Sequence, residues 1–139
     1  LNYKNNHAEL AYVEAQRTSA YLRERKTFSL FVKDALEKIK QDFFIFLMFG
    51  SAVTKKRKAR DIDILFIVKD KKDVPMSEKT LQNIATSFSI AFDIHVIAIE
   101  SVYEMLGKRD QINIMNETLN NHLIIVGAEN YYRVLQYAR

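Results

Sequence analysis

Residues 43–68 read FFIFLMFGSAVTKKRKARDIDILFIV, and this stretch decides how the chain is organised. Its first part, 43–49, is continuously apolar, which at this length is typical of a strand buried on both faces. Gly50 and Ser51 end that strand, and Ser51 is a plausible cap for a short following helix. A second strand, rich in β-branched residues, follows at 62–68. The stretch therefore predicts two core strands separated by a charged loop.

Helical and strand patterns alternate on either side of this stretch. Before it, apolar residues recur at helical spacing through residues 7–41, and the pattern weakens near Thr18, Ser19 and Thr27, so one long helix and two shorter ones fit equally well. The elements expected after residue 68 are a charged turn at 70–75, a helix capped by Ser77, a strand at 91–99, a helix opened by Ser101 and ended by Gly107, a helix around 112–119, a strand at 122–126 and a terminal helix at 128–137. This order predicts one mixed α+β domain at 42–139 behind a helical segment at 1–41.

The composition is that of one compact globular domain. The chain has 139 residues, of which 48% are hydrophobic and 27% are charged. It contains no cysteine, which excludes a disulfide framework and a thiolate metal site. The longest apolar run is too short to span a bilayer, and no signal peptide is visible. These features predict a cytoplasmic protein without a membrane partner, and the missing initial Met fits either a processed product or a piece of a longer protein.

A cluster of cations follows the first strand, although the net charge of the whole chain is only +4. Such a run is commonly just a solvated face. Here it follows the Gly50-Ser51 turn, whose free backbone N–H groups and hydroxyl can hold an anion, so the combination predicts a phosphate site. The cations are Lys55, Lys56, Arg57, Lys58 and Arg60.

Two aspartates come directly after the cations. Asp61 and Asp63 are two residues apart, so on a strand both carboxylates point to the same face. Two like charges about 5 Å apart cost roughly 3 kcal/mol at an effective dielectric constant of about 20, and a divalent cation such as Mg²⁺ offsets that cost. The alternative is that Asp61 pairs with Arg60 while Asp63 lies on a solvated strand face. The Gly-Ser turn upstream favours the metal site.

A third carboxylate, Asp93, lies early in the strand expected at 91–99. It is flanked by Phe92 and Ile94 in an apolar run, where an unpaired carboxylate is costly. We therefore expect Asp93 to complete the metal site, the alternative being a salt bridge to a lysine or arginine. His95 shares its face and could bind a metal or a phosphate, but we expect it to be a satisfied core histidine.

Together, Gly50-Ser51, Asp61-Ile62-Asp63 and Asp93 resemble the motif of the DNA polymerase β-like nucleotidyltransferase superfamily, and more narrowly that of the minimal nucleotidyltransferases of archaea and bacteria. The resemblance covers about residues 43–137. It implies that 42–139 is a nucleotidyltransferase domain of polymerase β-like fold, with helices mainly on one face of a mixed sheet. A DNA-binding winged helix ahead of the domain in the full-length protein would fit the helical segment at 1–41.

The resemblance also implies a function, the metal-dependent transfer of a nucleoside monophosphate from a triphosphate, with ATP favoured, to a hydroxyl. Asp61, Asp63 and Asp93 would be the catalytic residues and the ligands of two Mg²⁺ ions, with Mn²⁺ as a substitute. The acceptor would be a partner protein, as for an antitoxin, or a small molecule or RNA end, and the N-terminal helical segment could support a homodimer. The residues that would bind the nucleotide are Gly50, Ser51, Lys55, Lys56 and Arg60.

The loop departs from the family motif at two sequence positions and is about one residue shorter than is typical. Thr54-Lys55-Lys56 stands where a second glycine is usual, and Arg60 replaces the serine before the first aspartate. Without that glycine the backbone wraps phosphate less closely, although the added cations compensate by charge. The alternative function is therefore a nucleotide-binding sensor or regulatory module with weak or no catalysis. A nucleic-acid binder ranks last, because no aromatic residues are interleaved with the cations.

Overall fold

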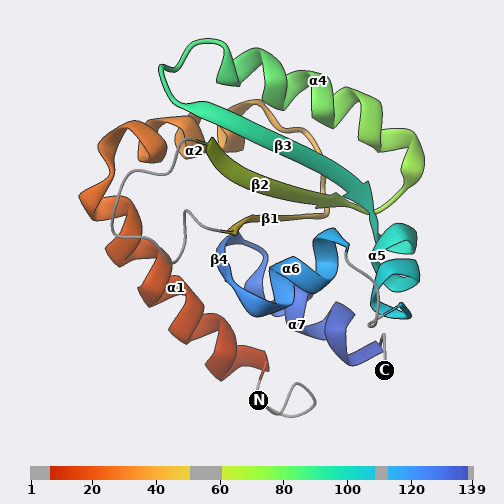
Figure 1. The fold of residues 1–139 in the computed structure, drawn as a ribbon. Helices are drawn as coiled ribbons and strands as arrows, with labels where there is room; N and C mark the ends of the chain where they lie inside the picture. The colour runs from red at the N-terminus through yellow and green to blue at the C-terminus, as the bar shows by residue number, and fades with distance from the viewer. Residues whose placement is uncertain (1–6, 51–60, 109–112, 138–139) are drawn as a thin grey trace.

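The computed structural model describes residues 7–50, 61–108 and 113–137, which are built around one four-stranded sheet. Its strands are β1 (Phe44–Phe49), β2 (Asp61–Val68), β3 (Ala91–Ala98) and β4 (His122–Val126), in the order β3-β2-β1-β4 (Figure 1). β1 is antiparallel to β2 and β4, whereas β2 and β3 run parallel. The prediction of a mixed sheet in an α+β protein is confirmed.

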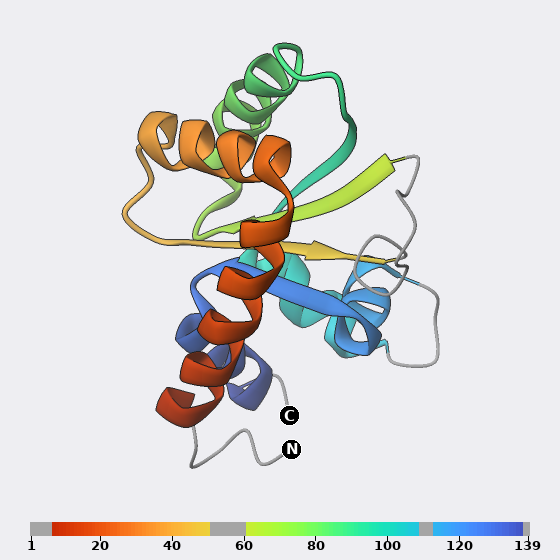
Figure 2. The ribbon, with the colours of Figure 1, turned by 90° about the vertical axis from the view of Figure 1, so that its left-hand side faces the viewer.

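Helices cover both faces of this sheet (Figure 1). One face carries α2 (Lys26–Lys38) and α4 (Val74–Ala85), the latter preceded by the 3₁₀ turn η1 (Lys71–Asp73), and the other carries α5 (Ile99–Leu106), α6 (Ile114–Asn120) and α7 (Ala128–Tyr137). α1 (His7–Glu24) packs against β4 and α7 (Figure 2). The expectation of helices mainly on one face is therefore wrong.

The strand sequences explain why two helical layers are needed. On β2, Ile64 and Phe66 pack in the core under α2 and α4, while Leu65 and Ile67 pack in the core on the other face. All four side chains are fully buried. A strand that is apolar on both sides exposes hydrophobic surface unless both faces are covered, so the continuous apolar run itself requires two layers.

The N-terminal helical pattern corresponds to two helices with Arg25 between them. α2 contributes Phe28 and Phe31 to the core beneath it, and the Phe31 ring stacks on Phe92 of β3 with 4.1 Å between ring centroids. α1 leaves Tyr12 exposed on its outer side. None of the helices in the described ranges combines the length and the apolar character that crossing a bilayer requires.

Two helix starts differ from the sequence prediction. α4 begins at Val74 and α5 at Ile99, so Ser77 and Ser101 lie inside these helices and do not cap them. Proline 75 is accommodated because it sits in the first turn of α4, where its missing N–H has no intrahelical partner to lose. The predicted end of α5 is confirmed, since Gly107 is its C-cap.

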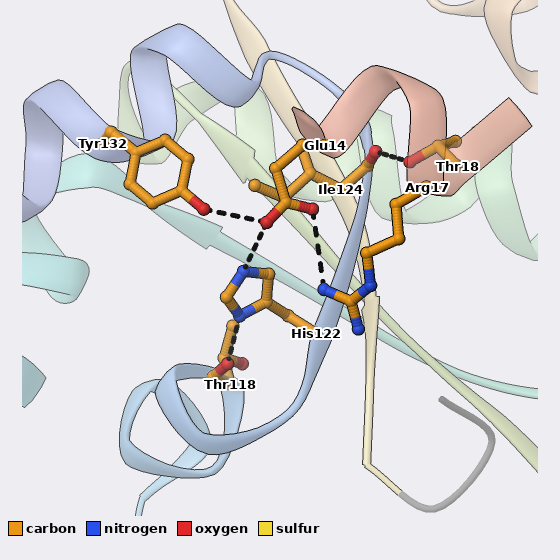
Figure 3. A network of polar contacts seen from close by, with 7 residues as sticks. All are labelled: Glu14, Arg17, Thr18, Thr118, His122, Ile124 and Tyr132. Carbon is orange, nitrogen blue, oxygen red and sulfur yellow. Dashed lines mark hydrogen bonds and ion pairs between the residues drawn. The ribbon is translucent and has the colours of Figure 1, made fainter. Parts of the chain in front are cut away.

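A buried polar network fastens α1 to the rest of the protein (Figure 3). The Glu14 residue is only 6% exposed. The Tyr132 hydroxyl donates a hydrogen bond of 2.8 Å to Glu14 Oε1, and His122 Nε2 lies 3.5 Å from the same oxygen. Arg17 Nη1 lies 3.8 Å from Glu14 Oε2 at the exposed margin. Both separations are longer than that of the Tyr132 hydrogen bond.

The network continues into the backbone of the neighbouring elements. The Thr18 hydroxyl donates to the carbonyl oxygen of Ile124 on β4, and His122 Nδ1 lies 2.9 Å from the carbonyl oxygen of Thr118 on α6. Burial alone would raise the pKa of Glu14, but the His122 side chain and the Tyr132 hydroxyl outweigh it, with smaller help from Arg17, and the net pKa lies below its ordinary value. The carboxylate is therefore held in its ionised form.

Candidate metal centre

The candidate site lies where β1 ends and the parallel strands β2 and β3 begin. Asp63 on β2 is the register partner of Asp93 on β3 and of Phe49, the last residue of β1. The next pair on the same face is Leu65 and His95, because side chains alternate along both strands. This register places two carboxylates and an imidazole on the face that α5, α6 and α7 cover.

Asp63, Asp93 and His95 form a compact cluster of metal-binding groups. One ligand atom from each residue lies within 4.8 Å of the others. His95 Nε2 is 3.2 Å from Asp93 Oδ2, and these two side chains are 39% and 57% exposed. The expectation that His95 is a core histidine is therefore wrong, because its ring lies among the carboxylates and is partly open to solvent.

The electrostatics of the cluster favour a bound cation. Burial raises the pKa of Asp63 above its ordinary value, and the neighbouring charge of Asp93 raises it further, against the opposing charge of His95. A hydrogen bond with Asp93 and the charge of Glu117 on α6 also raise the pKa of Asp63. A divalent ion would stabilise the ionised form of both aspartates, so the donor set fits such an ion.

Gly50 makes room for one of these carboxylates. Its φ of 76° lies in the left-handed region. A Cβ at this position would lie 2.7 Å from Asp63 Oδ2. Gly50 therefore meets two requirements at the end of β1: it adopts the left-handed backbone of the turn, and its lack of a Cβ leaves space for the Asp63 carboxylate. Its predicted role in binding nucleotide remains a prediction.

The remaining predicted site residues fall into two groups. Asp61 lies at the exposed start of β2, opposite Ala91 of β3. Because side chains alternate along a strand, Asp61 points to the same face as Asp63. It does not belong to the cluster of described residues that comes together around Asp63. The other predicted residues, which lie outside the described residues, are Ser51, Lys55, Lys56 and Arg60.

A cleft of about 560 Å³ opens beside the cluster. This volume is within the usual range of small-molecule sites, roughly 300–1,000 Å³. Phe49 and the cluster line one part of the cleft, and residues from α5, α6 and the α6 N-cap line another. Sequence reasoning did not find the latter, because ordinary helix-face residues carry no motif. They are Met105, Asn113, Ile114 and Glu117.

Comparisons of this chain with protein-family models, with curated proteins and with solved structures find no match. The fold and the cluster together define an α+β domain with a mixed four-stranded sheet and an Asp/Asp/His group beside a cleft. The chemistry of these residues is therefore the basis for a function.

Proposed function

We propose that this protein is a metal-dependent nucleotidyltransferase of the polymerase β-like kind that its sequence resembles. The observation that carries the proposal is the pairing of Asp63 with Asp93 at the start of two parallel strands, within one ligand cluster. Gly50 beside Asp63 and the adjacent cleft supply a turn and a space that suit a nucleotide. The basic loop at 55–60 adds cations for a triphosphate.

The reaction is a transfer in which the acceptor hydroxyl attacks the α-phosphorus of the triphosphate. A new oxygen–phosphorus bond forms, the bond from the α-phosphorus to the bridging oxygen breaks, and pyrophosphate leaves. A divalent ion at the cluster supplies charge stabilisation for the attacking and leaving oxygens. Asp93 lines the cleft and its carboxylate is more than half exposed, so the acceptor hydroxyl can reach it. Asp93 would take the hydroxyl proton as the oxygen bonds to phosphorus.

The other residues of the proposal bind and orient. Asp63 would hold the ion, and Asp61, at the exposed start of β2, would add a further carboxylate on the same face. The sequence resemblance assigns the terminal phosphates to Ser51 and the loop cations. The apolar lining of the cleft, which includes Phe49 and Ile114, gives a surface for the nucleobase or for the acceptor.

The proposal is tested by titrating ATP, GTP, CTP and UTP with a divalent ion into the wild-type protein and the Asp63→Asn variant. Asp70→Asn is the matched control, since Asp70 is exposed in the turn after β2. We expect calorimetry to show binding that needs the divalent ion, is lost in Asp63→Asn and is retained in Asp70→Asn.

Pyrophosphate release measured in the same samples separates the two functional hypotheses. Slow release that disappears in Asp63→Asn supports the transferase. Binding without release in the presence of protein, RNA and small hydroxyl acceptors supports the sensor instead. If no triphosphate binds with any divalent ion, the site is not a nucleotide site.

A further inference from the structure

The imidazole of His95 lies where a metal ligand would lie. Two donors bound to one ion at about 2.1 Å are about 3.0 Å apart at neighbouring octahedral positions and about 3.4 Å apart at tetrahedral ones. His95 Nε2 and Asp93 Oδ2 are 3.2 Å apart, between these two values. Opposite donors of an octahedral ion are about 4.2 Å apart, and the cluster spans no more than 4.8 Å. The widest donor separation therefore exceeds that of opposite octahedral donors by at most about 0.6 Å.

Neighbouring residues hold the donors in place. His95 is fixed to the same face as Asp93 by the alternation of β3, and its ring packs on the Phe49 ring with 5.9 Å between centroids. Asp63 Oδ2 lies against the backbone of Gly50. The donors therefore come from two adjacent strands and are supported by the end of a third, which limits how far they can separate.

We propose that His95 is the third ligand of this metal centre and that the centre selects a first-row transition ion over Mg²⁺. This inference rests on the proposed function and adds the class of ion to it. Mg²⁺ takes oxygen ligands almost exclusively in proteins, whereas imidazole suits ions such as Fe²⁺, Co²⁺, Ni²⁺ and Zn²⁺. A site with two carboxylates and one imidazole gains affinity along the series Mn²⁺, Co²⁺, Ni²⁺, while an all-oxygen site gains less.

The competing explanation is that His95 only donates a hydrogen bond to Asp93. In that case the ring nitrogen would carry a proton toward the carboxylate, and removal of the ring would change the affinities for Mg²⁺ and for transition ions by the same factor. The two explanations therefore predict different ratios of transition-ion affinity to Mg²⁺ affinity in the variant. A change in protein stability alone does not alter this ratio.

The test is calorimetric titration of Mg²⁺, Mn²⁺, Co²⁺ and Ni²⁺ into tag-free, metal-stripped protein without nucleotide. We compare wild type with His95→Asn and His95→Asp. His122→Asn is the matched control for loss of an imidazole, since His122 belongs to the Glu14 network and not to the cluster. Circular dichroism of each variant checks that it is folded.

We expect the wild type to bind Ni²⁺ and Co²⁺ at least about tenfold more tightly than Mg²⁺, and His95→Asn to lose at least about tenfold of the Ni²⁺ and Co²⁺ affinity with little change for Mg²⁺. His95→Asp should shift the preference toward Mg²⁺, and His122→Asn should leave it unchanged. Equal losses for all ions in His95→Asn, or no loss for any ion, would overturn the assignment of His95.

These results are distinguishable from failure of the proposed function. If triphosphates bind with Mg²⁺ and lose affinity in Asp63→Asn, while His95→Asn has wild-type ion preferences, the inference about His95 is wrong and the nucleotide site stands. If His95 governs transition-ion binding but no triphosphate binds, the metal ligand is correct and the nucleotidyltransferase is not.

Discussion

Replacing the buried residue Glu14 should weaken the docking of α1 more than replacing any solvent-exposed residue of that helix. In the folded protein the Glu14 carboxylate accepts the Tyr132 hydroxyl at 2.8 Å and faces His122 at 3.5 Å, with only 6% of the residue exposed. Glu14→Gln keeps the shape and one acceptor oxygen but removes the charge. Glu14→Ala removes the acceptor as well, and leaves the Tyr132 hydroxyl buried without this partner.

The magnitudes follow from the kinds of contact that are lost. A hydrogen bond to a charged group contributes about 1.5–3 kcal/mol and a neutral one about 1 kcal/mol, so Glu14→Gln should cost about 0.5–2 kcal/mol of unfolding free energy. Glu14→Ala removes the buried side chain as well as its acceptor oxygens, so the lost packing and the lost hydrogen bond together should cost about 3 kcal/mol. At about 4 °C of Tm per kcal/mol, Glu14→Ala should melt about 12 °C lower than wild type.

The assay is urea unfolding followed by circular dichroism at pH 7, with Glu9→Gln as the matched control. Glu9 lies in the first turn of the same helix and is exposed, so its replacement should change stability by no more than about 0.5 kcal/mol. A double-mutant cycle of Glu14→Gln with Tyr132→Phe should give a coupling energy of about 1 kcal/mol, because the two side chains share a hydrogen bond.

The pH dependence gives a second check on the same reasoning. The folded pKa of Glu14 lies below the ordinary value of 4.5, so its ionised form stabilises the protein above pH 4.5, and this contribution is lost as the pH falls through the folded pKa. Glutamine does not titrate, so the stability gap between wild type and Glu14→Gln should be present at pH 7 and should shrink as the pH falls below 4.5 through the folded pKa of Glu14. A gap that is absent at pH 7, or that grows on acidification, refutes a stabilising carboxylate at this position.

Three further predictions concern the glycines and the core. Gly50→Ala should cost about 1–2 kcal/mol of unfolding free energy, because alanine is disfavoured in the left-handed backbone of this residue. It should also weaken Co²⁺ binding in a calorimetric titration, because the new Cβ would lie 2.7 Å from Asp63 Oδ2. Gly107→Ala is the control, since a Cβ there would have its nearest atoms at 3.5 Å, and equal Co²⁺ affinity in both variants would contradict the packing argument. Gly127→Ala should cost at least about 2 kcal/mol in urea unfolding, because its φ is 90° and a Cβ would lie 2.9 Å from a backbone oxygen of β1; a neutral result would be inconsistent with this geometry. Phe31→Ala should cost about 3–5 kcal/mol in the same assay, because the ring is fully buried under α2, and a loss below about 1 kcal/mol would show that the core is packed differently.

The strands were predictable because their apolar runs are short, continuous and bounded by charged or glycine-containing segments. The expected strand at 43–49 is β1 (Phe44–Phe49), and the expected strand at 122–126 is β4 (His122–Val126). The arrangement of helices around the sheet was not predicted correctly, although the continuous apolar runs of the strands indicate that both faces of the sheet are covered. A strand that is hydrophobic on both sides needs cover on both sides, and this requirement outweighs the one-faced arrangement that the family resemblance implies.

Helix starts were less predictable than strands because several residues can satisfy the first N–H groups of a helix. Serine is a favoured cap, so Ser77 and Ser101 were expected to open α4 and α5, but α4 begins at Val74 and α5 at Ile99, and neither start has a side-chain cap. By contrast, Asn113 does cap α6, its side chain accepting a hydrogen bond from the backbone N–H of Asn116, and no sequence argument had singled it out.

The sequence by itself determined the strands and the two-residue spacing that gives Asp61 and Asp63 one face of β2, because alternation is a local property of the backbone. Only the tertiary structure decided that Asp63 lies beside Asp93 and that His95 joins them, because strand register sets which distant residues meet. The same holds for Glu14 and Tyr132, which are 118 residues apart and touch only when α1 docks. Local periodicity specifies which way a side chain points, and packing specifies what it meets there.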